Sequence, residues 1–112
     1  MDVQSHTRTH RVLQTLDPAT LADELYGSRR TLEDVLGEPV RAISYPVGKS
    51  LREAHDVRAA VRAAGYELGF SNGTGIDSVR RLDPLDVKRL SMDVSLGEPF
   101  FRAVLALPWL AY

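Results

Sequence analysis

The chain has 112 residues, 44% of them apolar and 26% charged, which is the balance of a folded globular protein rather than of a disordered segment. Its net charge of −1 argues against nucleic acid as a main partner, and the absence of cysteine excludes a disulfide framework and a thiolate zinc site. The length suits one domain over residues 1–112, without an apolar run that approaches the roughly 20 residues needed to span a bilayer.

Residues 1–4 are expected to form the end of a strand, and they lack the pattern of a signal peptide, so a cytoplasmic location is the default expectation. The first helix is predicted over residues 17–37. Asp17 is a typical N-cap, Pro18 suits the first helical position, and Gly37 suits the end of a helix. Five apolar residues repeat at helical spacing and predict one buried face: Leu21, Leu25, Leu32, Val35 and Leu36.

The next segment, residues 40–45, is predicted to be a short strand that ends at Pro46. Alternate residues of this strand would share one face: Val40, Ala42 and Ser44. A second helix is predicted from Ser50 to Gly65, because Ser50 and Glu53 have the spacing of a capping box. Its apolar positions are Ala54, Val57, Val61 and Ala64.

In the second half of the chain, residues 66–70 are predicted to form a strand, 71–75 a loop, 76–86 an irregular segment and 87–94 a last strand. In that last strand, the inward residues would be Leu90 and Met92. The last helix is expected to begin near Glu98. Its apolar positions are Phe100, Phe101, Val104, Leu105 and Leu107.

This alternation of helices and strands with short connections predicts an α/β fold with a parallel sheet of three or four strands. A parallel sheet normally has both faces covered by helices, and so few strands would leave open outer edges. Open edges recruit partners, so we expect either a homo-oligomer or a longer domain.

The segment with the most chemistry is residues 5–10, Ser-His-Thr-Arg-Thr-His. Its two imidazoles, His6 and His10, are spaced so that both can bind one metal ion, and neutral imidazoles are common zinc ligands. A third ligand, normally a carboxylate, would have to come from elsewhere. The alternative is a pair of solvent-exposed histidines in a polar segment. The helical metalloprotease pattern is disfavoured, because no Glu follows His6.

The other candidates have simpler interpretations. His55 is expected to be solvated on the polar face of the second helix. Residues 73–75, Gly-Thr-Gly, lack the Lys-Ser/Thr that ends a phosphate-binding loop, so a plain loop is expected. The arginine pairs at 29–30 and 80–81 are interpreted as solvated charges. Three C-terminal aromatic residues are expected in a core or an interface: Phe100, Phe101 and Trp109.

Taken together, three segments resemble the polysaccharide deacetylases, carbohydrate esterase family four. Residues 5–10 are similar to the second motif of that family, a Ser-His-Ser/Thr-x-x-His run. Residues 17–40 resemble the helix after it, with its closing Leu-Gly-x-Pro-Val. Residues 42–48, Ala-Ile-Ser-Tyr-Pro-Val-Gly, resemble the third motif in its Phe-x-Tyr-Pro-x-Gly variant. Residues 63–70 also match the next step from helix to strand.

The resemblance implies a partial, distorted (β/α) barrel that binds zinc or another divalent metal and removes acetyl groups from an N-acetylated polysaccharide or oligosaccharide. It implies that His6 and His10 are metal ligands. It also implies that the backbone N–H of Val47 stabilises the tetrahedral oxyanion, a role that backbone donors suit. The aromatic residue usual at position 47 is replaced, which should matter little to a backbone contact.

The departures from the family pattern concern the chemistry. The first motif, Thr-Phe-Asp-Asp, supplies the base and the third metal ligand upstream of the histidines, and the chain begins only five residues before His6. Ser44 stands where many members have an arginine. No Leu-x-His motif, the usual source of the general acid, occurs near Leu90, and the Asp/Trp-containing fourth motif is not recognisable after Phe70.

Two functions therefore remain open. The chain is either the C-terminal part of a metal-dependent polysaccharide deacetylase, weak or inactive alone, or a non-catalytic α/β scaffold that self-associates or binds glycan. Loss of a general base typically costs on the order of 10²–10⁴ in rate, so we expect the chain alone to hydrolyse little or nothing.

Overall fold

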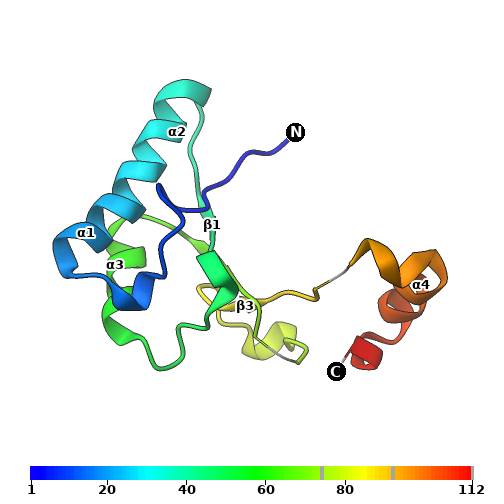
Figure 1. Cartoon of the computed structure of the whole chain (residues 1–112). Helices are drawn as coiled ribbons and strands as arrows, with labels where there is room; N and C mark the ends of the chain where they lie inside the picture. The colour runs from blue at the N-terminus through cyan, green and yellow to red at the C-terminus, as the bar shows by residue number, and fades with distance from the viewer. Residues whose placement is uncertain (74, 92, 112) are drawn as a thin grey trace.

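Three short parallel strands form the centre of the computed structural model, which describes residues 1–73, 75–91 and 93–111 (Figure 1). The strands are β1 (Ala42–Ser44), β2 (Leu68–Ser71) and β3 (Val87–Lys88), in the order β1-β2-β3. Ile43 pairs with Gly69 and Phe70 with Val87. The predicted α/β fold with a three- or four-stranded parallel sheet is confirmed, with three strands. The last strand is much shorter than predicted, and Met92 lies outside the described residues.

The N-terminal segment joins the sheet at one residue only. Ser5 forms an isolated parallel bridge with Ile43: its N–H donates to Ala42 O at 3.1 Å, and Ser44 N–H donates to Ser5 O at 2.9 Å. Residues 1–4 are not paired as a strand. The Gln4 side-chain oxygen instead accepts bonds from the N–H groups of residues 41 and 42, and so takes the place of a backbone partner.

The predicted first helix over residues 17–37 is confirmed, but it contains an unexpected turn. It consists of α1 (Pro18–Ala22), a π-helical turn (Asp23–Gly27) and α2 (Ser28–Leu36). Asp17 caps it by accepting bonds from the N–H groups of residues 19 and 20, and Gly37 ends it with a φ of 69°. A π turn adds a residue to the helical ladder and changes which side chains share a face.

The second helix, α3 (His55–Ala63), begins five residues later than predicted. The expected capping box does not form. The Ser50 hydroxyl donates to Asp86 and accepts from Arg52 N–H at 3.1 Å, so it stabilises a turn before the helix. Shorter helical turns occur at Leu13–Thr15, Pro46–Gly48, Val79–Arg81, Val94–Leu96 and Pro108–Ala111.

The core lies between the strands and the three helical segments α1, α2 and α3, which stand together on one side of the strands (Figure 1). Its most buried side chains include Leu25, Ile43, Leu51 and Val61, each 0% exposed. Two residues of the predicted helix face are not in the core, since Val35 is 81% and Leu36 39% exposed near the end of α2.

The last helix, α4 (Gly97–Ala106), stands away from the other helices and packs mainly against the short turns on either side of it (Figure 1). Of the five apolar residues predicted there, only Val104 is buried. None of the helices in the described part of the chain combines the length and the apolar composition needed to cross a membrane.

Candidate functional site

The two histidines of residues 5–10, here called the histidine loop, lie beside one another. The ring centroids of His6 and His10 are 4.8 Å apart, in an edge-to-face arrangement. The backbone makes this possible by adopting left-handed conformations at Thr7 (φ 66°) and His10 (φ 61°), which non-glycine residues rarely do. Both rings are exposed. The segment with metal-ligand spacing therefore folds into a loop that brings its two candidate ligands together.

The hydrogen bond made by His6 defines which of its nitrogens is free. Nδ1 lies 2.7 Å from Ser44 O at the end of β1. A carbonyl oxygen can only accept, so Nδ1 carries the proton of the neutral ring and Nε2 keeps its lone pair. Histidines that bind metals usually donate their second ring N–H to a carbonyl or carboxylate in this way. In its neutral form, the His6 ring with this hydrogen bond leaves Nε2 as the nitrogen that could bind a metal.

A buried carboxylate holds the middle of the histidine loop. Glu24, which is 3% exposed, accepts bonds at Oε2 from the backbone N–H groups of Arg8 and Thr9, both at 2.9 Å. Its Oε1 accepts a bond from the Thr9 hydroxyl. Burial raises the pKa of this carboxyl, but the bonds from Thr9 and Arg8 outweigh burial and lower the pKa below its usual value. Glu24 is therefore ionised at neutral pH.

A chain of buried hydroxyl groups holds the start of the loop. Ser5 Oγ lies 3.0 Å from Ser28 Oγ and accepts a bond from Thr7 N–H at 3.2 Å. Ser28 Oγ in turn lies 3.1 Å from the Tyr66 hydroxyl, and both hydroxyl oxygens lie 3.0 Å from Leu25 O, the acceptor at the end of the network. Ser5 and Ser28 are 2% and 5% exposed. This network connects the loop to the helix and to the segment before β2.

The π turn supplies most of these partners. Glu24 lies within it and Ser28 directly follows it. Asp23, also within it, accepts bonds from Arg8 Nη1 at 2.8 Å, although this pair is exposed. Sequence reasoning missed both Glu24 and Ser28. A signal existed for Ser28, because it lies at helical spacing between Leu25 and Leu32 on an otherwise apolar face.

The third-motif segment forms a tight turn directly after β1. Gly48 N–H donates to Tyr45 O at 3.0 Å, and Val47 has a φ of 61° and a ψ of −9°. These angles belong to the third residue of a type II turn, a position that favours glycine or asparagine over a β-branched side chain. No described residue accepts a hydrogen bond from the Val47 N–H. The turn therefore leaves the Val47 N–H without an acceptor among the described residues.

The other residues considered in the sequence analysis lie outside the histidine loop. His55 is exposed at the start of α3, as expected. The interpretation of Arg29 as a solvated charge is wrong. Its side chain is half-buried and donates to Glu33, to Val40 O just before β1 and to Ala64 O at the end of α3. Arg30, Arg80 and Arg81 are exposed.

Thr74, the middle residue of the Gly-Thr-Gly segment, lies outside the described residues. The C-terminal aromatics are not in the core, since Phe100, Phe101 and Trp109 are 36%, 44% and 60% exposed.

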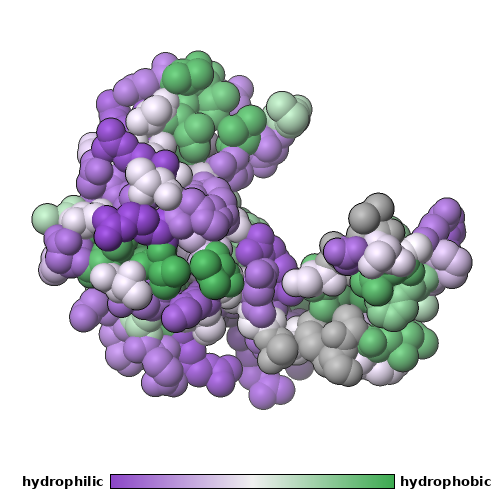
Figure 2. All heavy atoms as spheres, viewed as in Figure 1, coloured by the Kyte–Doolittle hydropathy of each residue, from purple (hydrophilic) through white to green (hydrophobic). Residues whose placement is uncertain are grey.

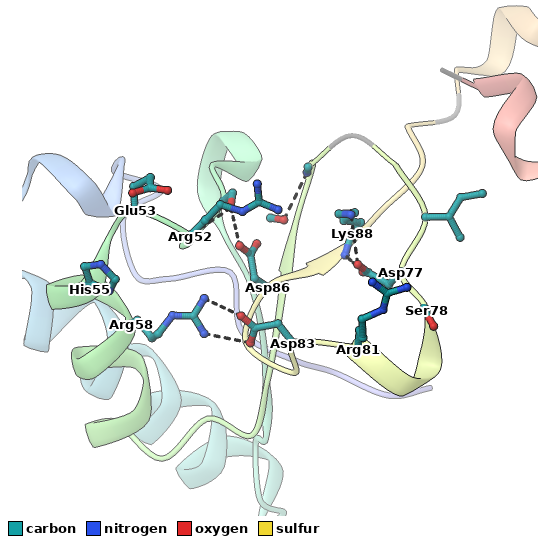
Figure 3. A pocket seen from close by; sticks show the side chains of 14 residues that line it. Arg52, Glu53, His55, Arg58, Asp77, Ser78, Arg81, Asp83, Asp86 and Lys88 are labelled. Carbon is teal, nitrogen blue, oxygen red and sulfur yellow. Dashed lines mark hydrogen bonds and ion pairs between the residues drawn. The ribbon is translucent and has the colours of Figure 1, made fainter.

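Away from the histidine loop, a hollow of about 1100 Å³ lies between the start of α3 and the segment that connects β2 to β3 (Figure 3). Its lining contains both acidic and basic side chains, some of them in ion pairs. Arg58 contacts Asp83 at 2.7 Å, and Lys88 contacts Asp77 at 3.4 Å. The lining is consequently of mixed charge and favours no single class of ligand.

The histidine loop brings two potential metal ligands together, His6 and His10. Within the residues that the structure describes, no group of three or more His, Cys, Asp and Glu side chains is arranged to hold a metal ion. Zinc sites usually take three protein ligands with a fourth position open, or four in structural sites. The donor set at His6 and His10 fits two of these positions.

Comparison with known proteins places this fold and this loop in one family. A model of the polysaccharide deacetylase family matches residues 1–69, which include the histidine loop, the first helix and the Pro46 turn. The chain belongs to the polysaccharide deacetylase family. Members of this family are metal-dependent, and the three strands with their flanking helices correspond to part of the deacetylase barrel.

Individual relatives agree with this assignment. The chain is 28% identical over 78 residues to YxkH of Bacillus subtilis (strain 168), covering 70% of this chain and 27% of YxkH. BC0361, a polysaccharide deacetylase from Bacillus cereus, is 31% identical with a TM-score of 0.64, covering 79% of this chain and 27% of that chain. The Streptococcus pyogenes deacetylase PplD in complex with acetate has a TM-score of 0.77, covering 89% and 42%, and at 23% identity it shows a shared fold. The chain thus spans about a quarter of the length of YxkH.

Proposed function

We propose that this chain provides the two-histidine part of the metal centre in a polysaccharide deacetylase that removes acetyl groups from N-acetylated sugars. The observation that carries this proposal is the pairing of His6 and His10 at 4.8 Å, with His6 Nδ1 committed to Ser44 O. The metal, zinc or another divalent ion, would be held by these two rings. When bound, it would polarise the acetyl carbonyl as a Lewis acid.

The Val47 N–H has a separate role in the proposal. It follows the His6 anchor at Ser44 by three residues and has no acceptor among the described residues. In the acyl-transfer chemistry of a deacetylase, a backbone donor with this freedom would stabilise the negative charge that develops on the carbonyl oxygen. The contribution comes from the backbone, so it does not depend on the side chain at position 47.

The carboxylate ligand and the general base would come from a polypeptide segment outside these 112 residues. The Thr-Phe-Asp-Asp sequence does not occur in the chain, and the described residues hold no third ligand near the two histidines. Residues 3–5 run beside β1 but pair with it only at Ser5. A parallel strand on the far side of that segment would bring its carboxyl end next to His6, since parallel strands present these ends at one edge.

Zinc titration tests the proposal directly. Calorimetry on the purified chain should show one weak zinc site that is lost in the His6→Ala/His10→Ala double variant. The matched control is His55→Ala, which removes the third histidine of the chain from an exposed position and should leave binding unchanged. Equal zinc binding by the double variant and the wild type would refute the proposal.

An acetate-release assay on an N-acetylglucosamine oligomer tests the missing groups. The chain alone should release little or no acetate, because loss of a general base costs on the order of 10²–10⁴ in rate. A fusion that places a strand ending in Asp-Asp before Met1 should raise the rate in the presence of zinc. Turnover by the 112-residue chain at the rate of a complete deacetylase would contradict this part of the proposal.

A second candidate function is self-association without catalysis, which the surface of the C-terminal segment favours. Hydrophobic residues gather on α4 in Figure 2, and exposed fractions are 44% for Phe101, 64% for Leu105 and 60% for Trp109. Apolar patches of this kind mark interaction surfaces. Sedimentation velocity should show a concentration-dependent oligomer that Leu105→Lys dissociates. Val79→Lys, at an exposed residue outside α4, should not dissociate it. A chain that stays monomeric at all concentrations would exclude self-association.

A further inference from the structure

We infer that Glu24 is a positioning residue that fixes His10 beside His6, and that the π turn exists in this helix to present it. The inference rests on the proposed function only in taking the histidine pair as the site. It assigns a role to a side chain that touches neither ring. The structural basis is the set of three bonds that the buried Glu24 carboxylate makes to Arg8 and Thr9.

The two histidines are held by different means. His6 is anchored to the sheet, because its own Nδ1 donates to Ser44 O and the neighbouring Ser5 is bridged to β1. No such anchor is assigned to the His10 ring among the described residues. His10 is placed by the backbone before it, where the N–H groups of Arg8 and Thr9 converge on one Glu24 oxygen. The position of His10 relative to His6 therefore depends on Glu24.

The carboxylate has the properties that such a role needs. It is 3% exposed, so its bonds do not compete with bulk water. Backbone N–H bonds to an ionised acceptor are roughly twice as strong as bonds between neutral groups. They also hold the loop at Thr7 and His10 in left-handed conformations, which a free chain would leave. The two strained residues, Thr7 and His10, flank the two N–H groups that Glu24 accepts, so these bonds can offset the strain.

The π turn brings the necessary side chains to the loop together. Asp23, Glu24 and Ser28 all contact residues 5–9; the first two begin the widened turn, and Ser28 directly follows it. Single π turns within α-helices are rare and occur frequently at functional sites. Here the turn has a specific structural consequence, namely three separate contacts to one loop.

The test compares two glutamates on the same helical segment. Glu24→Ala removes the loop clamp. Glu33→Ala is the matched control, because Glu33 likewise accepts a backbone N–H, that of Val40 at 3.0 Å, and pairs with Arg29, but it does not contact the histidine loop. Glu24→Gln is the conservative variant: its amide oxygen can accept both N–H groups and its NH₂ can donate to the Thr9 hydroxyl.

Two readouts separate positioning from stability. The first is the nuclear Overhauser effect between the His6 and His10 ring protons in the metal-free chain, and the second is zinc affinity by calorimetry. Glu24→Ala should lose the ring-to-ring effect, retain the His6 Nδ1–H tautomer, and bind zinc about 10–100-fold more weakly. Glu33→Ala should lower the thermal midpoint and leave both readouts unchanged. Glu24→Gln should restore most of both.

If Glu24→Ala does not fold, Thr9→Val replaces it, since Thr9 is exposed and the change removes only the hydroxyl bond. This variant should weaken the ring-to-ring effect and reduce zinc affinity, by less than Glu24→Ala does. Unchanged ring contacts in the Glu24 or Thr9 variant, or an equal loss in Glu33→Ala, would overturn the inference. A wild-type chain that binds no zinc but shows the Glu24-dependent ring contact would refute the metal proposal and leave the positioning role standing.

Discussion

The strained turn at Val47 leads to a prediction about stability. A β-branched side chain at a φ of 61° costs about 1–2 kcal/mol relative to a residue that tolerates the left-handed region. Asparagine tolerates that region, so Val47→Asn should recover most of this cost. The side chain is 62% exposed, so its burial contributes about a third of the 1.5–3 kcal/mol of a fully buried valine, or about 0.5–1 kcal/mol.

The net expectation for Val47→Asn is a gain of about 0.5–1 kcal/mol. For a chain of this size that corresponds to a rise of about 2–4 °C in the thermal midpoint, measured by circular dichroism or calorimetry. Val47→Gly should be close to neutral, because glycine also relieves the strain but loses more conformational entropy on folding. The control is Val47→Thr, which keeps the β-branched shape and should give no gain.

The order of the three variants decides the question. If Val47→Asn is no more stable than Val47→Thr, the left-handed backbone at this residue is not a source of strain, and the reasoning from the type II turn fails. A confirmed order would show that the chain maintains an unfavourable side chain at the residue whose N–H is the candidate oxyanion donor. Strained residues of this kind concentrate at functional sites.

Three further predictions concern the scaffold. Leu25→Ala, at a side chain that is 0% exposed, should cost about 2–5 kcal/mol in chemical denaturation, whereas Leu105→Ala should have little effect because Leu105 is 64% exposed. Gly69→Ala should destabilise the chain by about 3 kcal/mol, since the new Cβ would lie 1.9 Å from Tyr45 Oη and 2.8 Å from Leu85 O. The control is Gly73→Ala, in which the atoms nearest to the new Cβ would be 3.4 Å away. The hydrogen bond from Arg58 lowers the pKa of Asp83 in the folded state. The stabilisation by ionised Asp83 is therefore complete above the unfolded-state pKa and is lost as pH falls through the folded-state pKa. Asp83→Asn should flatten the dependence of the unfolding free energy on pH below about pH 4, and an unchanged dependence would contradict this.

Local signals in the sequence predicted the elements whose hydrogen bonds are themselves local. Asp17 caps the first helix through residues two and three positions away, and Gly37 ends it by its own conformation. The capping box at Ser50 failed for the opposite reason. The Ser50 hydroxyl bonds to Asp86, which is 36 residues away, and no local pattern contains that information.

In the candidate site, too, local contacts were predictable from the sequence and contacts between distant residues were not. The pairing of His6 with His10 is a property of a short loop, so their spacing was sufficient to predict that both rings could serve one site. The groups that orient them are distant in sequence: Ser44 O is 38 residues from His6, and Glu24 is 15 residues from Thr9. The π turn was a second reason that Glu24 was not predicted. A pattern with 3.6 residues per turn does not allow for the added residue, so it does not predict which side chains share a face beyond it.

Two kinds of constraint therefore meet at the histidine loop. The sheet fixes His6 through Ser44, and the helix fixes His10 through Glu24, so any motion between sheet and helix would change the distance between the rings. The hydroxyl chain from Ser5 through Ser28 to Tyr66 opposes such motion, since it connects the loop, the helix and the segment before β2 within the core. Burial of polar groups is costly unless every partner is satisfied, and here the partners are hydrogen-bonded to one another and to Leu25 O. Under the proposed function, this rigidity would lower the entropy cost of metal binding, because the two histidine side chains would already be ordered.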